Sequence, residues 1–374
     1  NTIYNNVFNC TGAGGAVTFQ STCNGNNLTN NTIISNSGNG ITFNTGVQFN
    51  IVDSNTITST SGYGIRHTTT TRNNSITRNT ITTSSNYGIY MDSGSSDCNV
   101  TNNVINILTG SKEAVYILTS VRVNVSNNNI TSNNSIALRL VTNANTNTIN
   151  NNILRSKTNY SLSISGSSSN TITNNVLNST SNTSVYIDST SGSNNFYYNN
   201  FTQTSDYYIN CNNATNNFNT TNGTTAKGNY YFNISSIDIS DSNGDNWGDG
   251  GTAYPLNATN WNTKWVGSGN DYGPWTNRAP SITITTKTPY FNTSSVTSGI
   301  NVSAYCNGTS SDSSLLNYSY NFYINNTLNL SSSNNGSFTS GTGINLYNFT
   351  SASGGTEYKF ECQARNINGN GSWI

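Results

Sequence analysis

The feature that most constrains this chain is a short Asn-rich motif that returns about every 24 residues. It reads Asn, any residue, an apolar residue, two further residues, Asn, any residue and a second apolar residue, as in NTITNNVL at 170–177. A near-constant period of this length predicts a stack of similar structural repeats. With the second Asn of each motif as the anchor, nine anchors follow one another at spacings of 23 to 25 residues: Asn6, Asn31, Asn55, Asn79, Asn103, Asn128, Asn152, Asn175 and Asn199.

Apolar residues keep a constant phase to each anchor. Around Asn79, for example, Ile76 lies three residues before and Ile81 two residues after, and the pair Ile89 and Met91 follows ten to twelve residues later. Alternation of this kind is typical of strands with one buried face. One coil cannot bury its own apolar face, but stacked coils bury a continuous column, so the pattern predicts an all-β, parallel β-helix of about nine coils. We interpret Gly40, Gly64 and Gly88, which precede three of the later strands, as turn residues.

The anchors are predicted to form a ladder of amides. A side-chain amide both donates and accepts hydrogen bonds, and stacked amides can bond along the stack. Asn also tolerates left-handed backbone at turns. Five residues before the anchors runs a second column, seven of whose nine members are Asn: Asn1, Asn26, Asn50, Asn74, Cys98, Val123, Asn147, Asn170 and Asn194. Two such columns would brace both ends of the same strand.

The motif, followed by "GI-x-apolar" segments, resembles the right-handed β-helix repeats of the NosD-like and pectate-lyase-like superfamily over residues 1 to about 213. The segments KGNYYF (227–232), DSNGDNWGDGGTAYPL (241–256) and DYGPW (271–275) resemble the C-terminal end of NosD-type repeat domains. The resemblance implies a right-handed helix at 1–226 and a cap and linker with an Asp/Asn-rich loop at 227–279. It does not specify an activity, because β-helices host many functions.

The remaining residues, 280–374, carry short alternating runs separated by turn signals. These runs predict a β-sandwich that resembles immunoglobulin-like domains and lacks its last strand. Cys306 and Cys362 would form a disulfide between its two sheets. Cys10 and Cys23 lie in the first coil and could pair across its loop.

Composition narrows the classes of function. Charged residues make up only 7% of the chain, with 14 basic and 14 acidic residues, so the concentrated basic surface of a nucleic-acid-binding protein is not expected. No apolar run is long enough to span a bilayer. Abundant Asn-x-Ser/Thr sequons, many of which the composition alone would generate, allow N-linked glycans in an exported protein. The candidate glycosylation sites are Asn178, Asn182, Asn213, Asn257, Asn292, Asn307, Asn317 and Asn348.

Two groups of residues could hold a metal ion. Alternating oxygen-bearing side chains on a tight loop suit Ca²⁺, although a plain Asx-rich turn explains them as well; they are Asp241, Asn243, Asp245 and Asp249. His67 and Met91 share one column in consecutive coils, which would suit Cu(I), a soft metal. Neighbours Phe43 and Ile117 in that column favour a buried core histidine instead, and we do not transfer the copper-handling role of the NosD-like proteins.

The acids of the nine coils show no two in phase on adjacent coils, and we expect no enzymatic activity. The main prediction is a structural glycoprotein at the cell surface, part of a filament, sheath or adhesive fibre like archaeal-type surface proteins. It would assemble head to tail, by strand donation or with other surface proteins. The alternative is a carbohydrate-binding or carbohydrate-processing protein with exposed tyrosines such as Tyr63, Tyr87, Tyr197 and Tyr198. A cluster of Arg66, Arg72 and Arg78 is either a solvated face or a contact for an acidic glycan.

Overall fold

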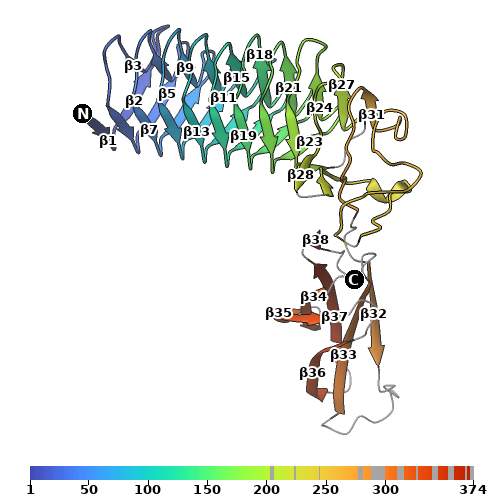
Figure 1. Ribbon diagram of the computed structural model, residues 1–374. Helices are drawn as coiled ribbons and strands as arrows, with labels where there is room; N and C mark the ends of the chain where they lie inside the picture. Colours follow the sequence, from blue (N-terminus) through green and yellow to red (C-terminus); the bar gives the residue numbers. More distant parts are fainter. Residues whose placement is uncertain are drawn as a thin grey trace. The chain divides into compact units, whose positions relative to one another are not determined.

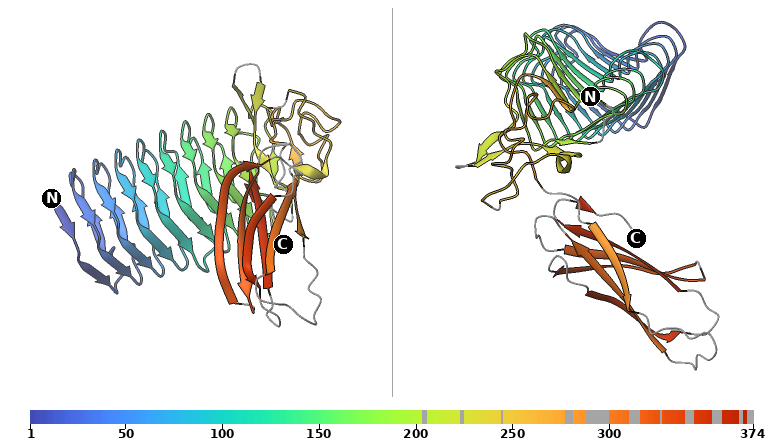
Figure 2. Two further views of the ribbon diagram at one scale, coloured as in Figure 1. Left: turned by 90° about the horizontal axis from the view of Figure 1, so that it is seen from below. Right: turned by 90° about the vertical axis from the view of Figure 1, so that its right-hand side faces the viewer.

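In a computed structural model, two compact units are formed by residues Asn1–Thr276 and Asn277–Ile374. The structure describes residues 1–202, 206–222, 225–243, 245–276, 281–287, 300–309, 316–325, 327–338, 344–352, 358–366 and 369–370. The first unit is a stack of coils (Figure 1), and the right-hand view of Figure 2 shows the same coils nearly end-on.

Each coil contributes one strand to each of three parallel sheets, which we call A, B and C. Sheet A contains β1 (Thr2–Tyr4), β4 (Asn27–Thr29), β7 (Ile51–Asp53), β10 (Ser75–Thr77), β13 (Asn99–Thr101), β16 (Asn124–Ser126), β19 (Thr148–Asn150), β22 (Thr171–Thr173) and β25 (Asn195–Tyr197). Sheet B contains β2 (Val7–Cys10), β5 (Thr32–Ser35), β8 (Thr56–Ser59), β11 (Thr80–Thr83), β14 (Val104–Ile107), β17 (Asn129–Ser132), β20 (Ile153–Ser156), β23 (Val176–Ser179), β26 (Asn200–Phe201) and β30 (Tyr230–Tyr231). Sheet C contains β3 (Val17–Phe19), β6 (Ile41–Phe43), β9 (Ile65–His67), β12 (Ile89–Met91), β15 (Val115–Leu118), β18 (Leu138–Val141), β21 (Leu162–Ser165), β24 (Val185–Ile187), β27 (Ile209–Cys211) and β31 (Trp265–Gly267).

The predicted apolar columns form the interior of this stack. Ile57, Ile81 and Ile105 pair in register on consecutive strands of sheet B, and all three are fully buried. Burial of one such side chain contributes about 1.5–3 kcal/mol, and each coil buries several. The prediction of a parallel β-helix of about nine coils is therefore confirmed.

Glycine before the strands of sheet C is required by space. A Cβ atom on Gly40 would lie 2.6 Å from Cγ2 of Ile57 and 2.6 Å from the carbonyl oxygen of Gly64. The φ angle of Gly40 is not positive, so the backbone conformation alone does not require glycine at this position. Close packing of the next coil, and not a special turn conformation, therefore selects glycine here.

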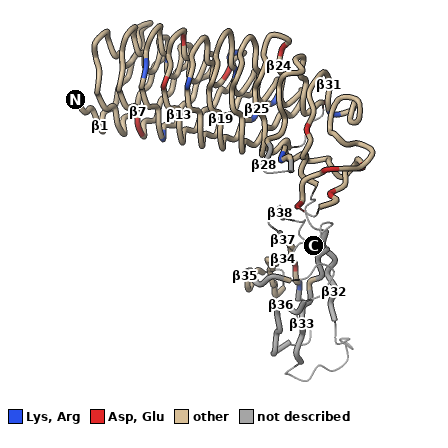
Figure 3. The backbone as a smooth tube through the Cα atoms, viewed as in Figure 1, with Lys and Arg blue, Asp and Glu red and all other residues tan. Residues whose placement is uncertain are grey.

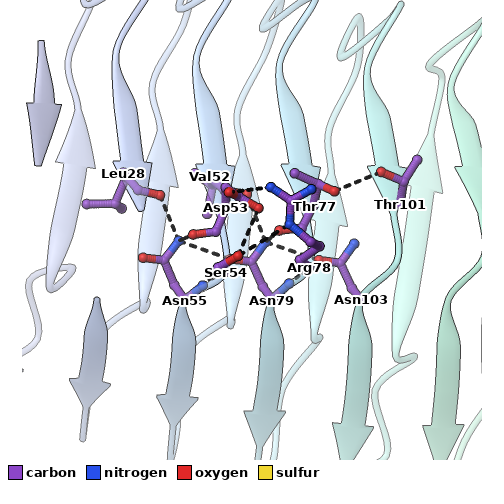
Figure 4. Close-up of polar contacts among 10 residues, drawn as sticks. All are labelled: Leu28, Val52, Asp53, Ser54, Asn55, Thr77, Arg78, Asn79, Thr101 and Asn103. Carbon is purple, nitrogen blue, oxygen red and sulfur yellow. Dashed lines mark hydrogen bonds and ion pairs between the residues drawn. The ribbon is translucent and has the colours of Figure 1, made fainter. Parts of the chain in front are cut away.

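The anchors form a continuous amide ladder between sheets A and B (Figure 4). The backbone N–H and Nδ2 of Asn79 both donate to Oδ1 of Asn103, at 2.9 and 3.1 Å, and Nδ2 also donates to the carbonyl of Val52 at 2.8 Å. The same forward bonds recur from Asn6 to Asn199. Each amide thus satisfies buried backbone groups of two coils, which water cannot reach.

The anchors themselves do not adopt left-handed backbone. The positive φ angle falls on the residue before each anchor, for example 54° at Arg78 and 59° at Asn102. The residue before the anchor is Asn in most coils but Arg78 or Tyr198 in others, so the turn tolerates several residue types. The anchor is therefore Asn because its side chain must both donate and accept.

The ladder ends on a carboxylate that the repeat did not reveal. Asn199 donates to Oδ1 of Asn229, and Asn229 donates from its backbone N–H (3.0 Å) and Nδ2 (3.2 Å) to Oδ2 of Asp271. Tyr231 and Gly273 donate to Asp271 as well. Each amide of the row donates to the next, so the last one needs a group whose oxygens accept hydrogen bonds, and the carboxyl group of Asp271 meets that need.

The first unit continues beyond residue 226, where we predicted the helix to end. Strands β30 and β31 extend sheets B and C in register with β26 and β27. A hairpin of β28 (Thr220–Asn222) and β29 (Thr225–Lys227) and a 3₁₀-helix, η1 (Ile234–Ser236), lie in the connections between these strands. Longer connections interrupt the 24-residue period in this segment, but β30 and β31 still pair with the strands of the last regular coil.

The described residues of the second unit form two antiparallel sheets. One contains β32 (Ser281–Lys287), β33 (Ile300–Thr309) and β36 (Ile344–Ala352); the other contains β35 (Thr327–Phe338), β34 (Leu316–Ile324), β37 (Tyr358–Asn366) and β38 (Gly369–Asn370). A disulfide joins Cys306 of β33 to Cys362 of β37, with 6.4 Å between their Cα atoms. Strand β35, which is rich in Ser and Asn, was not predicted. The immunoglobulin-like sandwich stays a prediction.

Candidate functional site

The outward residues of sheet C break the Ser/Thr/Asn pattern of the coils in four consecutive strands. The central residues of β9, β12, β15 and β18 are Arg66, Tyr90, Tyr116 and Arg139, and strand pairing places them opposite one another in register. Their neighbours in each strand are buried, so alternation points these four side chains outward. Parallel strands are spaced by about 4.8 Å, so the row follows the axis of the stack.

A second outward row lies beside the first. Tyr63 and Tyr87, two residues before β9 and β12, stack with ring centroids 5.5 Å apart, and Tyr90 and Tyr116 stack at 5.3 Å. The two pairs also touch each other: Tyr63 lies 5.2 Å from Tyr90, and Tyr87 lies 5.0 Å from Tyr90 and 5.1 Å from Tyr116. We call these four residues the tyrosine platform. All four are half-buried, so each ring keeps part of its surface in solvent.

Charged groups border the platform. The guanidinium of Arg66 lies 5.3 Å from the centroid of the Tyr63 ring, and the ammonium of Lys112 lies 5.7 Å from that of Tyr87. Arg139 forms an ion pair with Glu113, with 3.0 Å between Nη1 and Oε1. Charged residues are otherwise sparse along the stack (Figure 3).

Three of the platform tyrosines, Tyr87, Tyr90 and Tyr116, remain neutral at physiological pH. Burial is the main cause that raises the pKa of Tyr90 to about 12 and the pKa values of Tyr87 and Tyr116 above their ordinary range. The hydroxyl groups therefore stay able to donate as well as accept hydrogen bonds. A surface of neutral rings with polar tips binds ligands that present both apolar and hydroxyl groups.

A second tyrosine pair repeats the arrangement further along the same sheet. Tyr160, two residues before β21, stacks on Tyr186, the central residue of β24, at 5.0 Å. This is the diagonal relation that joins Tyr63 to Tyr90 and Tyr87 to Tyr116. Outward aromatic residues on sheet C thus extend beyond the platform, with Arg139 between the two groups.

The sequence identified only part of this face. Tyr63 and Tyr87 belong to the platform, whereas Tyr197 and Tyr198 lie at β25, where Tyr198 contacts Trp247 at 5.5 Å. Tyr90 and Tyr116 were missed, although the alternation around them was visible in the sequence. The three arginines predicted to cluster lie apart on the coils. Arg66 is on sheet C, Arg72 lies between sheets C and A, and Arg78 lies between sheets A and B, where it pairs with Asp53 at 2.7 Å.

His67 lies in the core. It is fully buried, its Nδ1 lies 2.9 Å from Oγ1 of Thr71, and its ring centroid is 4.4 Å from that of Phe43. Burial lowers its pKa to about 3, so the imidazole is neutral, and its Nε2 has no hydrogen-bond partner. Among the described residues, no three His, Cys, Asp or Glu side chains come together as metal ligands.

The Asp/Asn-rich loop is held by its own backbone. Asp241 accepts hydrogen bonds from the N–H groups of Asp245 and Asn246, and Asn243 also accepts from Asp245. Asp249 accepts from the N–H and hydroxyl of Ser242. This is the bonding of an Asx-rich turn; occupancy by Ca²⁺ stays a prediction.

The other predicted residues have the following places. Cys10 and Cys23 are free thiols, and Sγ of Cys10 lies 3.2 Å from the carbonyl oxygen of Gly14, so the bridge considered between them is not formed. Among the glycosylation candidates, Asn292 lies outside the described residues, and the side chains of Asn307 and Asn348 are not described. The remaining candidates lie in turns or strands and are partly accessible to solvent: Asn178, Asn182, Asn213, Asn257 and Asn317.

Comparisons with known proteins agree with the fold. Residues 1–108 match the model of NosD, described as a periplasmic copper-binding protein, and residues 73–229 match the model of a right-handed β-helix region. No curated protein sequence matches the chain.

Several solved structures resemble the chain at low identity. A double mutant of the periplasmic alginate epimerase AlgG shares 13% identity over 55% of this chain, with a TM-score of 0.39. The chain covers 64% of that epimerase, which is less than two thirds of its length. A tailspike protein of Acinetobacter baumannii bacteriophage Fri1, a capsular polysaccharide depolymerase, shares 10% identity over 97% of this chain and 68% of its own, with a TM-score of 0.27. A tailspike protein mutant of E. coli bacteriophage HK620, in complex with a pentasaccharide, shares 10% identity over 98% and 86% of the two chains, with a TM-score of 0.30.

The two matched models together cover residues 1–229, the same segment whose strands stack into sheets A, B and C. The chain is therefore a right-handed parallel β-helix repeat protein.

Proposed function

We propose that this protein binds a linear glycan along the outer face of sheet C, outside the cytoplasm. The observation that carries the proposal is the tyrosine platform, because four half-buried rings in mutual contact are unusual on a surface that is rich in Ser, Thr and Asn. A sugar ring has one face of C–H groups and a rim of hydroxyl groups. The first packs on aromatic rings and the second bonds to charged and hydroxyl side chains.

The period of the coils suits a polymer. Successive strands of sheet C are about 4.8 Å apart, which is close to the length of one sugar residue in an extended chain. A glycan that runs along the axis would therefore place about one residue on each coil. The platform and the pair of Tyr160 and Tyr186 would then contact separate stretches of one chain.

Binding without cleavage is the simplest role for this face. Glycoside hydrolysis by the usual route requires two carboxyl groups placed on either side of the scissile bond. Glu113 is paired with Arg139, and Oδ1 of Asp92 accepts a hydrogen bond from the N–H of Ser93. Both carboxylates are thus engaged by the protein itself, and we propose that the chain is not an enzyme.

The test uses glycan binding by the full chain and its variants. We expect the Tyr90→Ala/Tyr116→Ala double variant to lose at least tenfold in affinity, since each aromatic contact contributes about 0.5–1.5 kcal/mol beyond the area it buries. Tyr90→Phe should keep most of the affinity, because it retains the ring. Tyr272→Ala, at an exposed tyrosine near the C-terminal end of the unit, is the control. A glycan array without hits, or equal affinities for all variants, would contradict the proposal.

A structural role at the cell surface is a second candidate. The amide ladder and the continuous core couple every coil to the next, which makes the unit suited to a stiff spacer in a filament, sheath or adhesive fibre. Among the described residues no helix has the length and hydrophobicity to cross a membrane. Negative-stain images of native material would show fibres if the chain assembles, and dispersed single particles would argue against this role. N-linked glycans and a structural Ca²⁺ belong to the same proposal.

A further inference from the structure

Two arginines of the same outward row, Arg66 and Arg139, differ in whether a carboxylate pairs with them. Arg66 and Arg139 are both central residues of sheet C strands, on either side of Tyr90 and Tyr116. Arg139 forms an ion pair with Glu113 of the preceding coil, with 3.0 Å between Nη1 and Oε1. The corresponding position in the coil that precedes Arg66 is Asn39, two residues before β6.

Asn39 offers Arg66 no charge and is itself occupied. Its Nδ2 donates to Oγ1 of Thr42 at 3.0 Å, and its Oδ1 accepts from the backbone N–H of Tyr63 at 3.1 Å. Within the described part of the chain, Arg66 forms no ion pair, and its buried Nε has no hydrogen-bond partner. The buried Nε of Arg139 has no partner either, so the two arginines differ in the carboxylate that pairs with Arg139 and not with Arg66.

Lys112 adds a second cation at the same edge. It is exposed, lies over Tyr87, and has no acidic partner among the described residues. Tyr63 and Tyr87 stack on each other, so the two cations border adjacent rings of one row. This edge of the platform therefore carries two cations without an ion-pair partner, whereas Arg139 is paired with Glu113; the charges of Glu113 and Asp92 also act on Tyr87 and Tyr90.

We propose that the ligand of this face is an anionic polysaccharide, whose carboxylate or sulfate groups bind to Arg66 and Lys112 while its sugar rings pack on the tyrosine platform. This inference rests on the proposed function and specifies its ligand. The guanidinium of Arg66 can offer its two terminal Nη groups to a carboxylate in bidentate geometry, and the ring of Tyr63, 5.3 Å away, restricts its orientation. Lys112 contributes a point charge.

The experiment compares three polymers on the intact protein: polygalacturonate, dextran sulfate and neutral dextran. We expect one or both anionic polymers to bind at least tenfold more tightly than neutral dextran at low salt, with affinity that falls as salt is added. Arg66→Gln/Lys112→Gln should lose at least tenfold in affinity for the anionic polymer. Arg155→Gln/Lys157→Gln, which removes the same two charges from β20 and the turn that follows it, is the matched control and should change affinity less than twofold.

The outcomes separate this inference from the proposed function. If neutral dextran binds as tightly as the anionic polymers and Tyr90→Ala weakens both, the glycan-binding function stands and the anionic ligand is refuted. Equal losses in the Arg66/Lys112 and Arg155/Lys157 variants, which remove the same charge, would show attraction by net charge alone, which also refutes the inference. If no glycan on the array binds, both proposals fail together. Preference for dextran sulfate over polygalacturonate would identify sulfate as the recognised group, and the reverse would identify carboxylate.

Discussion

Replacement of one ladder Asn tests whether the amides hold the coils together. Asn103 lies in the middle of the stack and is almost fully buried. Its Oδ1 accepts from the backbone N–H and the Nδ2 of Asn79, and its Nδ2 donates to the carbonyl of Ile76 and to Oδ1 of Asn128. Asn103→Ala removes all four bonds at once.

The size of the effect follows from what is left behind. The N–H of Asn79 stays buried without a partner, which costs about 1–3 kcal/mol, and each of the two bonds donated by Asn103 contributes about 0.5–1.5 kcal/mol. The Nδ2 of Asn79 keeps its bonds to the carbonyls of Val52 and Thr77 and adds little. The expected loss in the free energy of unfolding is therefore about 2–6 kcal/mol.

Urea denaturation of the full chain, followed by hydrogen exchange of the coils on either side, measures this loss. Asn106→Ala is the matched control, because Asn106 lies three residues further on and points outward from sheet B. The control should change the free energy of unfolding by less than about 0.5 kcal/mol. If Asn103→Ala costs no more than Asn106→Ala, the ladder contributes no stability and our account of the repeat is wrong.

Three further predictions concern buried groups. Burial raises the pKa of Asp271 to about 7, above the value of about 3.9 in an unfolded chain, so its contribution to stability is complete at low pH and is lost as the pH rises toward 7. Burial lowers the pKa of His67 to about 3, below about 6.5 in the unfolded chain, so its contribution is lost as the pH falls below 6.5. Between pH 4 and 6.5 the two groups change the stability in opposite directions. The Asp271→Asn variant keeps only the effect of His67, so its urea midpoint should rise with pH, whereas the His67→Phe variant keeps only the effect of Asp271, so its midpoint should fall. Parallel pH profiles of the two variants would contradict both assignments. Finally, reduction of the disulfide between Cys306 and Cys362, which lie 56 residues apart, should destabilise the second unit by about 4 kcal/mol. Calorimetry with and without reductant should show no shift for the first unit, and a shift in both transitions would indicate that the two units unfold together.

The interior of the first unit was predictable because each inward position repeats under the same constraint. Ile81 packs between Ile57 and Ile105, so the sequence must supply an apolar residue at the same phase in every coil. The end of the ladder was not predictable, because the connections after β27 break the period and bring Asp271 to Asn229 from 42 residues away. Only the folded structure shows that Asn229 is the last amide of the ladder and that Asp271 accepts its hydrogen bonds.

The outward positions carry the functional information for the opposite reason. Packing does not constrain them, so most coils place Ser, Thr or Asn there, and a departure from these residues requires a cause other than the fold. Tyr90 and Tyr116 stack on each other and contact Tyr87, yet each keeps part of a large ring in solvent. Arg66 keeps a buried donor without a partner, which Thr in its place would avoid. Since these departures coincide on three consecutive strands of one sheet, a ligand that contacts all of them is the explanation that accounts for each.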